Sequence, residues 1–164
     1  MFQKMEDFKK SWDAESKFTQ SVFDALTDAS LSQSINNDHR TIGRIAWHIC
    51  ETITEMLPHI GLKFELVKAP APTSAKVISE KYAELSKALT NQVADWSDEK
   101  LQEENDLYGE QWKKGATLLI LIKHEVHHRG QMTVLMRQAG VVVPSIYGPA
   151  KEGWVDYKME PPAL

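Results

Sequence analysis

Apolar residues recur three and four positions apart along four long segments of the chain, and this spacing constrains the fold more than any other feature. The clearest segment begins near Thr41 and ends before Pro58. Its apolar face consists of Ile42, Ile45, Ala46, Ile49, Ile53, Met56 and Leu57. No segment shows the alternation that a convincing half-buried strand requires. The sequence therefore predicts an all-α protein, a four-helix bundle that forms a single domain over residues 1–164.

The other three helices are bounded by residues that cap or end helices. We expect the first over about Met5–Leu26 and the fourth over about Gly115–Gln138. Either Thr73 or Ser74 can cap the third helix, because a hydroxyl at that position accepts a hydrogen bond from the first helical turn. Gly140 is placed to end the fourth helix, since glycine adopts the left-handed conformation common after helix ends.

Three connecting segments complete the predicted architecture. The stretch LPHIGLKFELVKAPAPTSA is long and rich in proline, which interrupts helices, and its length suits a crossover between the two ends of a bundle. The acidic stretch SDEKLQEENDLYGEQW is expected to be a loop or a short helix. The C-terminal segment after Gly140 is rich in proline and glycine. We expect it to be a short tail packed across the bundle.

The charge and the cysteine content exclude several classes of partner and site. The formal net charge is -4 and no basic run is present, so the chain lacks the cationic surface that nucleic acid requires. No apolar window is long enough to cross a membrane, and the N-terminal segment lacks the apolar core of a secretion signal. We therefore expect a cytoplasmic protein. The single cysteine, Cys50, rules out an internal disulfide and any cysteine-rich zinc cluster.

The stretch HEVHHRGQM, residues 124–132, places three histidines inside the fourth predicted helix. Buried imidazoles need partners. His124 and His128 are four residues apart, so their side chains stand one above the other on the apolar face and can bind one metal ion. His127 lies about 100° around the helix from His128 and is not expected to join them.

A third ligand is needed from elsewhere in the chain, because catalytic zinc sites usually have three protein ligands and one open position. His39 and His59 fall in predicted loops, whereas His48 lies in the middle of the second helix, beside its apolar face. A lone histidine in that position is also compatible with a half-buried side chain that bonds a carbonyl. With the pair on the fourth helix, we predict a divalent metal site formed by His48, His124 and His128. Zn²⁺ and Ni²⁺ both suit nitrogen ligands.

Three stretches together resemble the DinB family of bacterial four-helix-bundle proteins, which includes YfiT-like members: RIAWHICETI around His48, HEVHHRGQM, and GVVVPSIYGPAKEGW after the last helix. The resemblance implies a bundle with a long crossover and a divalent metal held by His48, His124 and His128. It also implies a homodimer. Members with assigned activities are thiol-dependent transferases or isomerases that use low-molecular-weight thiols such as bacillithiol or mycothiol. Many others have no known activity.

Three side chains near the predicted ligands are candidates for catalysis, each with a structural alternative. Glu125 is a candidate base, although it is displaced around the helix from the ligands and is expected to face a partner helix or solvent. Gln131 lies on the ligand face and can contact a metal-bound water, or can be an ordinary buried amide. Tyr147 is expected to anchor the tail, with its hydroxyl as a candidate for reaching the site. Cys50 projects away from His48 and is expected to be a small core residue.

Four functions are compatible with these residues. The favoured one is a metal-dependent transferase that joins a small-molecule thiol to an electrophile, and its alternative is a non-catalytic metal-binding module of stress or damage responses. A zinc hydrolase is suggested by the literal H-E-x-x-H of His124–His128. However, Val134 stands where the extended zinc-peptidase motif has its third histidine. A di-iron bundle needs a second E-x-x-H motif, which the chain lacks.

Overall fold

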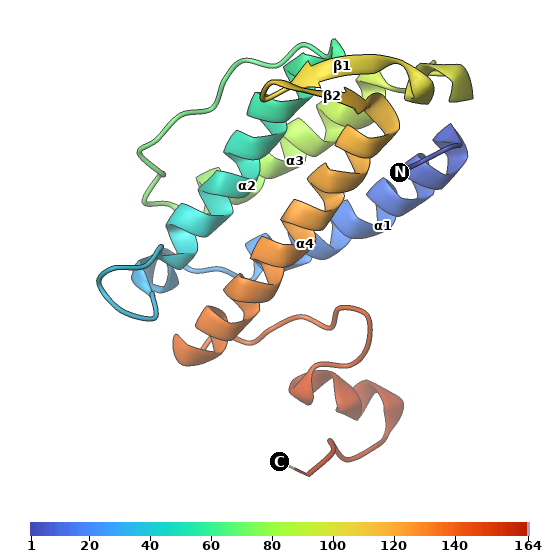
Figure 1. The fold of residues 1–164 in the computed structure, drawn as a ribbon. Coiled ribbons are helices and arrows are strands. Elements are labelled where there is room, and N and C mark those ends of the chain that lie inside the picture. Colours follow the sequence, from blue (N-terminus) through green and yellow to red (C-terminus); the bar gives the residue numbers. More distant parts are fainter. Residues whose placement is uncertain (164) are drawn as a thin grey trace.

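The computed structural model describes residues 1–163, and four long helices lie side by side in it (Figure 1). They are α1 (Met5–Asp24), α2 (Ile42–Met56), α3 (Ala75–Gln92) and α4 (Lys114–Gln138). Helix α4 packs against α1 and α2, and α3 packs against the same two helices. The predicted all-α four-helix bundle is therefore confirmed. Among the described residues, no helix is both long and apolar enough to span a bilayer.

The helix boundaries follow from capping groups that the sequence supplies. The hydroxyl of Thr41 accepts from the backbone of Arg44 at 3.2 Å and starts α2. Of the two residues predicted to cap α3, Ser74 is the one that does so. Helix α1 ends at Asp24, slightly before the expected end, because Thr27 caps a separate 3₁₀ turn, η1 (Asp28–Ser32), that turns the chain away. Gly140 follows α4 with φ of +71°, a conformation that favours glycine.

The crossover between α2 and α3 is an extended strap that begins after a short 3₁₀ helix, η2 (Leu57–Ile60) (Figure 1). Two hydrogen bonds hold it against α2. The indole of Trp47 donates to the carbonyl of Lys68 at 2.9 Å, and the amide of Val67 donates to the hydroxyl of Thr54 at 3.0 Å. These two hydrogen bonds satisfy polar groups of the strap and hold it in place along α2.

The acidic stretch before α4 was expected to be a loop or a short helix, and this prediction was incomplete. It forms a 3₁₀ helix, η3 (Asp98–Gln102), and then an antiparallel hairpin of β1 (Glu104–Leu107) and β2 (Glu110–Lys113). The turn consists of Tyr108 and Gly109, both with positive φ, as two-residue hairpin turns require. The strands are short and charged, and Leu107 is their one fully buried residue. They therefore lack the alternation by which strands are recognised.

The tail packs across the bundle only in its first part. Val143 is buried, and Val141 and Ile146 pack against the core. Beyond them, the 3₁₀ helix η4 (Lys151–Tyr157) contains no buried residue and extends away from the bundle (Figure 1). The core itself lies between the four helices, where Phe8 and Trp12 stack with ring centroids 6.4 Å apart.

Candidate metal centre

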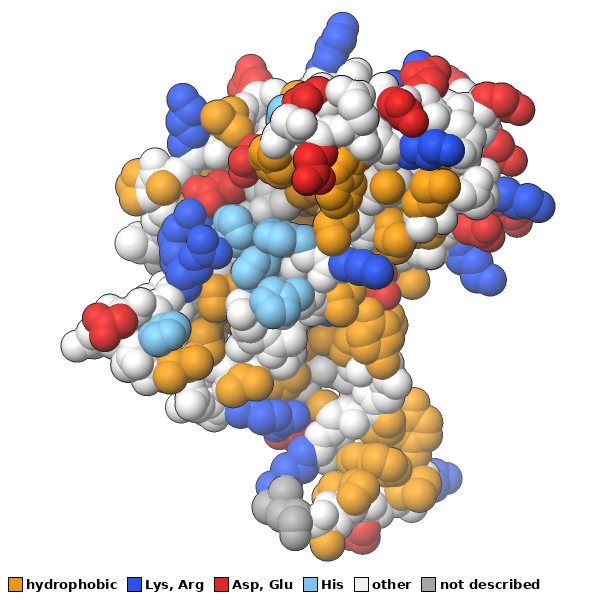
Figure 2. Space-filling view, in the orientation of Figure 1, with side chains coloured by type: hydrophobic (Ala, Val, Ile, Leu, Met, Phe, Trp, Pro, Cys, Tyr) orange, Lys and Arg blue, Asp and Glu red, His pale blue; other side chains and the backbone are white. Residues whose placement is uncertain are grey.

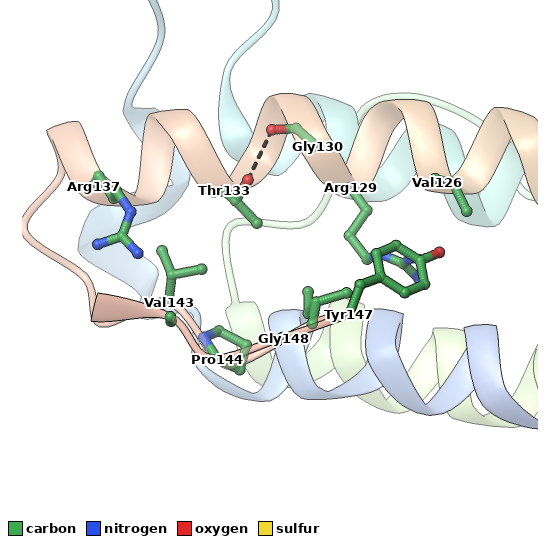
Figure 3. A pocket seen from close by; sticks show the side chains of 11 residues that line it. Val126, Arg129, Gly130, Thr133, Arg137, Val143, Pro144, Tyr147 and Gly148 are labelled. Carbon is green, nitrogen blue, oxygen red and sulfur yellow. Dashed lines mark hydrogen bonds between the residues drawn. The ribbon is translucent and has the colours of Figure 1, made fainter. Parts of the chain in front are cut away.

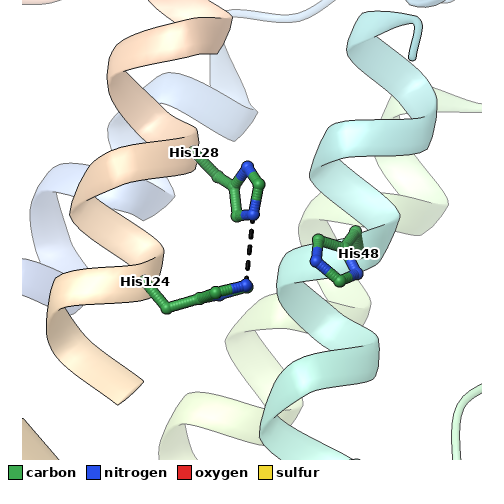
Figure 4. A group of neighbouring side chains, drawn as sticks. All are labelled: His48, His124 and His128. Atoms are coloured by element: carbon green, nitrogen blue, oxygen red, sulfur yellow. Dashed lines mark hydrogen bonds between the residues drawn. The ribbon is translucent and has the colours of Figure 1, made fainter. Parts of the chain in front are cut away.

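Three histidines from two neighbouring helices converge in the structure (Figure 4). His48 lies on α2, and His124 and His128 lie on successive turns of α4, which packs directly against α2. One nitrogen from each ring lies within 4.8 Å of the other two. The Nε2 atoms of His124 and His128 are 3.1 Å apart. Among the histidine, cysteine, aspartate and glutamate side chains of residues 1–163, these three histidines form the group that is positioned to hold a metal ion.

Neighbouring side chains lie beside two of these rings, and one of them forms a hydrogen bond. The Nδ1 of His128 donates to the Oε1 of Gln131 at 2.8 Å, so the lone pair of Nε2 of His128 faces Nε2 of His124. The Nδ1 of His48 lies 3.6 Å from the carboxylate of Glu51, which also pairs with Arg44 at 2.7 Å. A hydrogen-bonded partner on the far nitrogen, as Gln131 is for His128, fixes the tautomer and direction of a metal-binding imidazole.

The environment keeps the three imidazoles neutral. Burial lowers the pKa of His48 and of His124 to about 4, and nearby charges of Arg40 and the other histidines act in the same direction. Burial also lowers the pKa of His128. Metal ions bind the neutral form of histidine. The rings are therefore ready to bind a cation at neutral pH without first losing a proton.

The remaining histidines lie outside this group, as the helical geometry predicted for His127. Its Nε2 accepts from the amide of Gln131 at 3.1 Å. His39 is exposed and contacts Asn36, and His59 is exposed and contacts the carbonyl of Asp106. Gln131 thus links His127 to His128 through its two ends.

Glu125 points away from the three histidines, into the core between α1 and α3. Its Oε1 accepts from the hydroxyl of Thr19 at 2.6 Å and from that of Tyr82 at 2.7 Å, while Oε2 is buried without a hydrogen-bond partner. Burial raises the pKa of Glu125 to about 7. The alternative that it faces partner helices is the one observed. Cys50 is also buried in the core, and burial raises the pKa of its thiol.

Tyr147 anchors the tail on the opposite side of α4 from the histidines. Its hydroxyl contacts the carboxylate of Glu15 at 2.6 Å and accepts from Arg129 at 2.7 Å, and its ring meets the edge of Phe18. With Arg129 it lines a cavity of about 340 Å³ between α4 and the tail (Figure 3). Tyr147 is therefore part of the tail contact, as expected, and does not line the pockets beside the three histidines.

Two pockets open on either side of the three histidines, and each contains at least one of them. The first, here called the loop pocket, has a volume of about 450 Å³ and lies beside the loop that precedes α2. It is lined by Ile35, Asp38, His39, Arg40, Ile45, His128, Gln131, Val134 and Leu135. The second, here called the hairpin pocket, has a volume of about 280 Å³. It is lined by His48, Thr52, Glu55, Met56, Leu107, Tyr108, Trp112, Ile120 and His124.

The sequence of the whole chain matches a known family. A family model of the DinB family matches residues 1–160. The chain belongs to the DinB family. It is 44% identical over 167 residues to the uncharacterized protein YrdA of Bacillus subtilis (strain 168), and the match covers 100% of both chains. The resemblance inferred from the stretches around His48 and His124 is thus confirmed.

Solved DinB-like structures have the same fold. A DinB-like protein from Bacillus cereus ATCC 10987 is 47% identical, with a TM-score of 0.86 over 90% of this chain and 100% of the other. The DinB-like protein YjoA from Bacillus subtilis is 17% identical, with a TM-score of 0.65 over 88% of this chain and 96% of the other. This second likeness supports the fold alone. The three histidines therefore lie on helices of a DinB-family four-helix bundle.

Sequence reasoning missed several side chains around the centre of this DinB-family chain. Glu51 has a signal in the sequence, because it follows His48 by three residues and so shares its helical face. Arg40 and Tyr108 have none, because they lie in loops whose course the helical spacing does not define. The pocket walls therefore became visible only in the structure.

Proposed function

We propose that this DinB-family protein is a metal-dependent transferase that joins a small-molecule thiol to an electrophile. One observation carries the proposal: three neutral imidazoles converge at a point flanked by two separate pockets. A reaction between two small molecules needs two adjacent binding sites that meet at the reacting atoms. The loop pocket and the hairpin pocket supply such a pair, with His128 in one and His48 and His124 in the other.

The residues present fit a divalent cation. Three nitrogen ligands with oriented rings suit Zn²⁺ or Ni²⁺. The described residues offer three ligands in the group, whereas structural zinc sites are normally closed by four protein ligands. A site with three ligands leaves a position for an exchangeable partner, and this favours chemistry over a purely structural role.

The division of roles follows from the chain's own groups. His48, His124 and His128 would hold the cation, and Gln131 would keep the ring of His128 in place. When bound, a divalent cation lowers the pKa of a coordinated thiol or water. The thiol sulfur would form the new bond to the electrophilic carbon, the leaving group would depart with the bonding electrons, and the thiol proton would pass to solvent. Cys50 would take no part, because its thiol is buried in the core.

Two alternatives predict different behaviour. A zinc hydrolase of the H-E-x-x-H type needs its glutamate beside the metal as a base. Glu125 instead lies in the core, where it is hydrogen-bonded by Thr19 and Tyr82, and this position argues against a hydrolase. A non-catalytic metal-binding module would use the same three histidines for folding or sensing, and turnover separates it from the transferase.

The experiment loads the purified protein with Zn²⁺ or Ni²⁺ and measures conjugation of a panel of low-molecular-weight thiols, including bacillithiol, to monochlorobimane. We expect turnover that requires the metal and is lost in His48→Ala. Metal-dependent cleavage of casein without thiol conjugation would favour the hydrolase. If the protein holds stoichiometric metal but shows neither thiol conjugation nor casein cleavage, the non-catalytic module would be favoured.

A further inference from the structure

The two pockets beside the three histidines differ in charge. The loop pocket contains a cationic side chain, Arg40, together with the carboxylate of Asp38. The hairpin pocket contains one charged side chain, the carboxylate of Glu55, which accepts from the hydroxyl of Tyr108 at 3.2 Å. A substrate with an anionic group at one end is therefore disfavoured on the hairpin side and has a cationic partner on the loop side.

Arg40 is a free cation. Within residues 1–163, no hydrogen bond or ion pair involves its guanidinium, whereas Arg44, one helical turn further on, is paired with Glu51 at 2.7 Å. Arg40 and His128, one of the three histidines of the centre, line the same pocket. Figure 2 shows basic side chains directly beside the gathered histidines on the open face of the molecule.

A surface arginine is most often a solvated charge, and the setting of Arg40 distinguishes it. It belongs to a pocket with apolar walls from Ile35, Ile45 and Leu135, and one of the three histidines lines the same pocket. The volume of about 450 Å³ falls within the range of about 300–1,000 Å³ that small-molecule sites occupy. Apolar walls with one arginine suit a small organic anion even beside Asp38, since guanidinium binds carboxylates through two parallel hydrogen bonds.

We propose that Arg40 binds a carboxylate of the small thiol in the loop pocket, so that the thiol sulfur faces the three-histidine centre and the electrophile is left to the hairpin pocket. This inference rests on the proposed transferase function. Arg40 is thus a specificity-determining residue for the thiol. It selects an anionic thiol over an uncharged one of similar size.

The test measures binding rather than turnover. The full-length protein is loaded with Co²⁺, and the sulfur-to-cobalt charge-transfer absorption is followed during titration with mercaptosuccinate, which carries two carboxylates, or with monothioglycerol, which is uncharged. Three variants are compared with the wild type: Arg40→Gln, Asp38→Asn and Lys87→Gln. Lys87 is an exposed residue of α3, which lines neither pocket, so its variant makes the same change in net charge as Arg40→Gln.

Arg40→Gln is expected to weaken mercaptosuccinate binding about tenfold, because a charge-assisted hydrogen-bonded pair is lost. Its binding of monothioglycerol and its cobalt content should equal those of the wild type. Asp38→Asn should strengthen mercaptosuccinate binding, since it removes a like charge from the same pocket, and Lys87→Gln should change nothing. Equal effects of Arg40→Gln on both thiols, or no effect on either, would overturn the proposal.

The design separates this inference from the proposed function. If neither thiol produces a charge-transfer band, the thiol-transfer function fails. Succinate, which lacks sulfur, is then titrated calorimetrically into the cobalt-loaded protein. Binding that is weaker in Arg40→Gln than in Lys87→Gln would still support an anion site at Arg40. Equal binding in both variants, or none in the wild type, would overturn it.

Discussion

The Nε2 atoms of His124 and His128 face each other at 3.1 Å, although the residues stand on successive turns of one helix. The Nδ1 of His128 donates to Gln131, so its Nε2 is left as an acceptor. His48 meets the pair from α2, with ring centroids 5.0 Å from His124 and 4.9 Å from His128. A shared cation would bind a nitrogen lone pair of all three imidazoles, whereas a hydrogen bond between two rings leaves the third ring out.

The first prediction concerns the ligand set. Alanine in place of His48, His124 or His128 should each remove stoichiometric metal, because a cation held by two protein ligands binds weakly. His127→Ala should retain it, since His127 lies outside the group. Metal content after gel filtration, measured by mass spectrometry, decides this. Retention by His48→Ala together with loss by His127→Ala would show that the ligand set is wrong.

The second prediction concerns the orientation of His128. Gln131→Ala removes the acceptor of its Nδ1 proton, and loss of such a partner typically lowers metal affinity about 10–100-fold. Competition with a chromogenic chelator measures the affinity. Gln138→Ala is the matched control, because Gln138 is an exposed residue near the end of the same helix. The interpretation fails if both variants bind metal as the wild type does.

The third prediction concerns Glu125, whose pKa is raised from an ordinary value of 4.5 to about 7 by burial. Between pH 4.5 and about 7, the carboxyl group of Glu125 is therefore protonated in the native state and ionised in the unfolded state. The stability from this group is present below pH 4.5 and is lost as the pH rises through about 7. Glu125→Gln, which is uncharged, should lack this loss and should be more stable than the wild type at pH 8.

Urea unfolding of the chelator-treated protein at pH 5 and pH 8 measures the effect. Glu125→Ala serves as the contrasting variant. It should be destabilised at both values by about 1–3 kcal/mol, because the hydroxyls of Thr19 and Tyr82 lose their acceptor. Glu125→Gln should also retain full metal content and any thiol conjugation. Loss of turnover in this variant with normal stability would instead assign Glu125 a catalytic role.

The helices and the three histidines could be predicted from the sequence because both depend on the period of the α-helix. His124 and His128 share a face by their spacing, and His48 lies in the middle of a strongly amphipathic segment. The hairpin could not be predicted, since its strands are short and its conformation depends on the turn at Tyr108 and Gly109. The position of Arg40 depends likewise on a loop.

A fourth prediction is that the protein is a homodimer at micromolar concentration. The bundle buries its own core, but Val155, Tyr157 and Met159 remain exposed on the segment that extends beyond it. Exposed apolar clusters of this kind commonly mark contacts with other molecules. Light scattering coupled to gel filtration gives the mass directly, and a monomer of 18.6 kDa would contradict the prediction.

The hairpin and the loop before α2 line the two pockets beside the three histidines but carry none of those histidines. The candidate metal ligands sit on α2 and α4, whose packing fixes their geometry, while distinctive side chains of both pockets come from segments that join helices. Connecting segments accept substitutions more readily than packed helices do. If the centre acts on small molecules as proposed, exchanges at Arg40 or Tyr108 would change which molecules it accepts while His48, His124 and His128 stay constant. On the proposed function, a lineage built on this bundle would acquire new substrates without changes in its core.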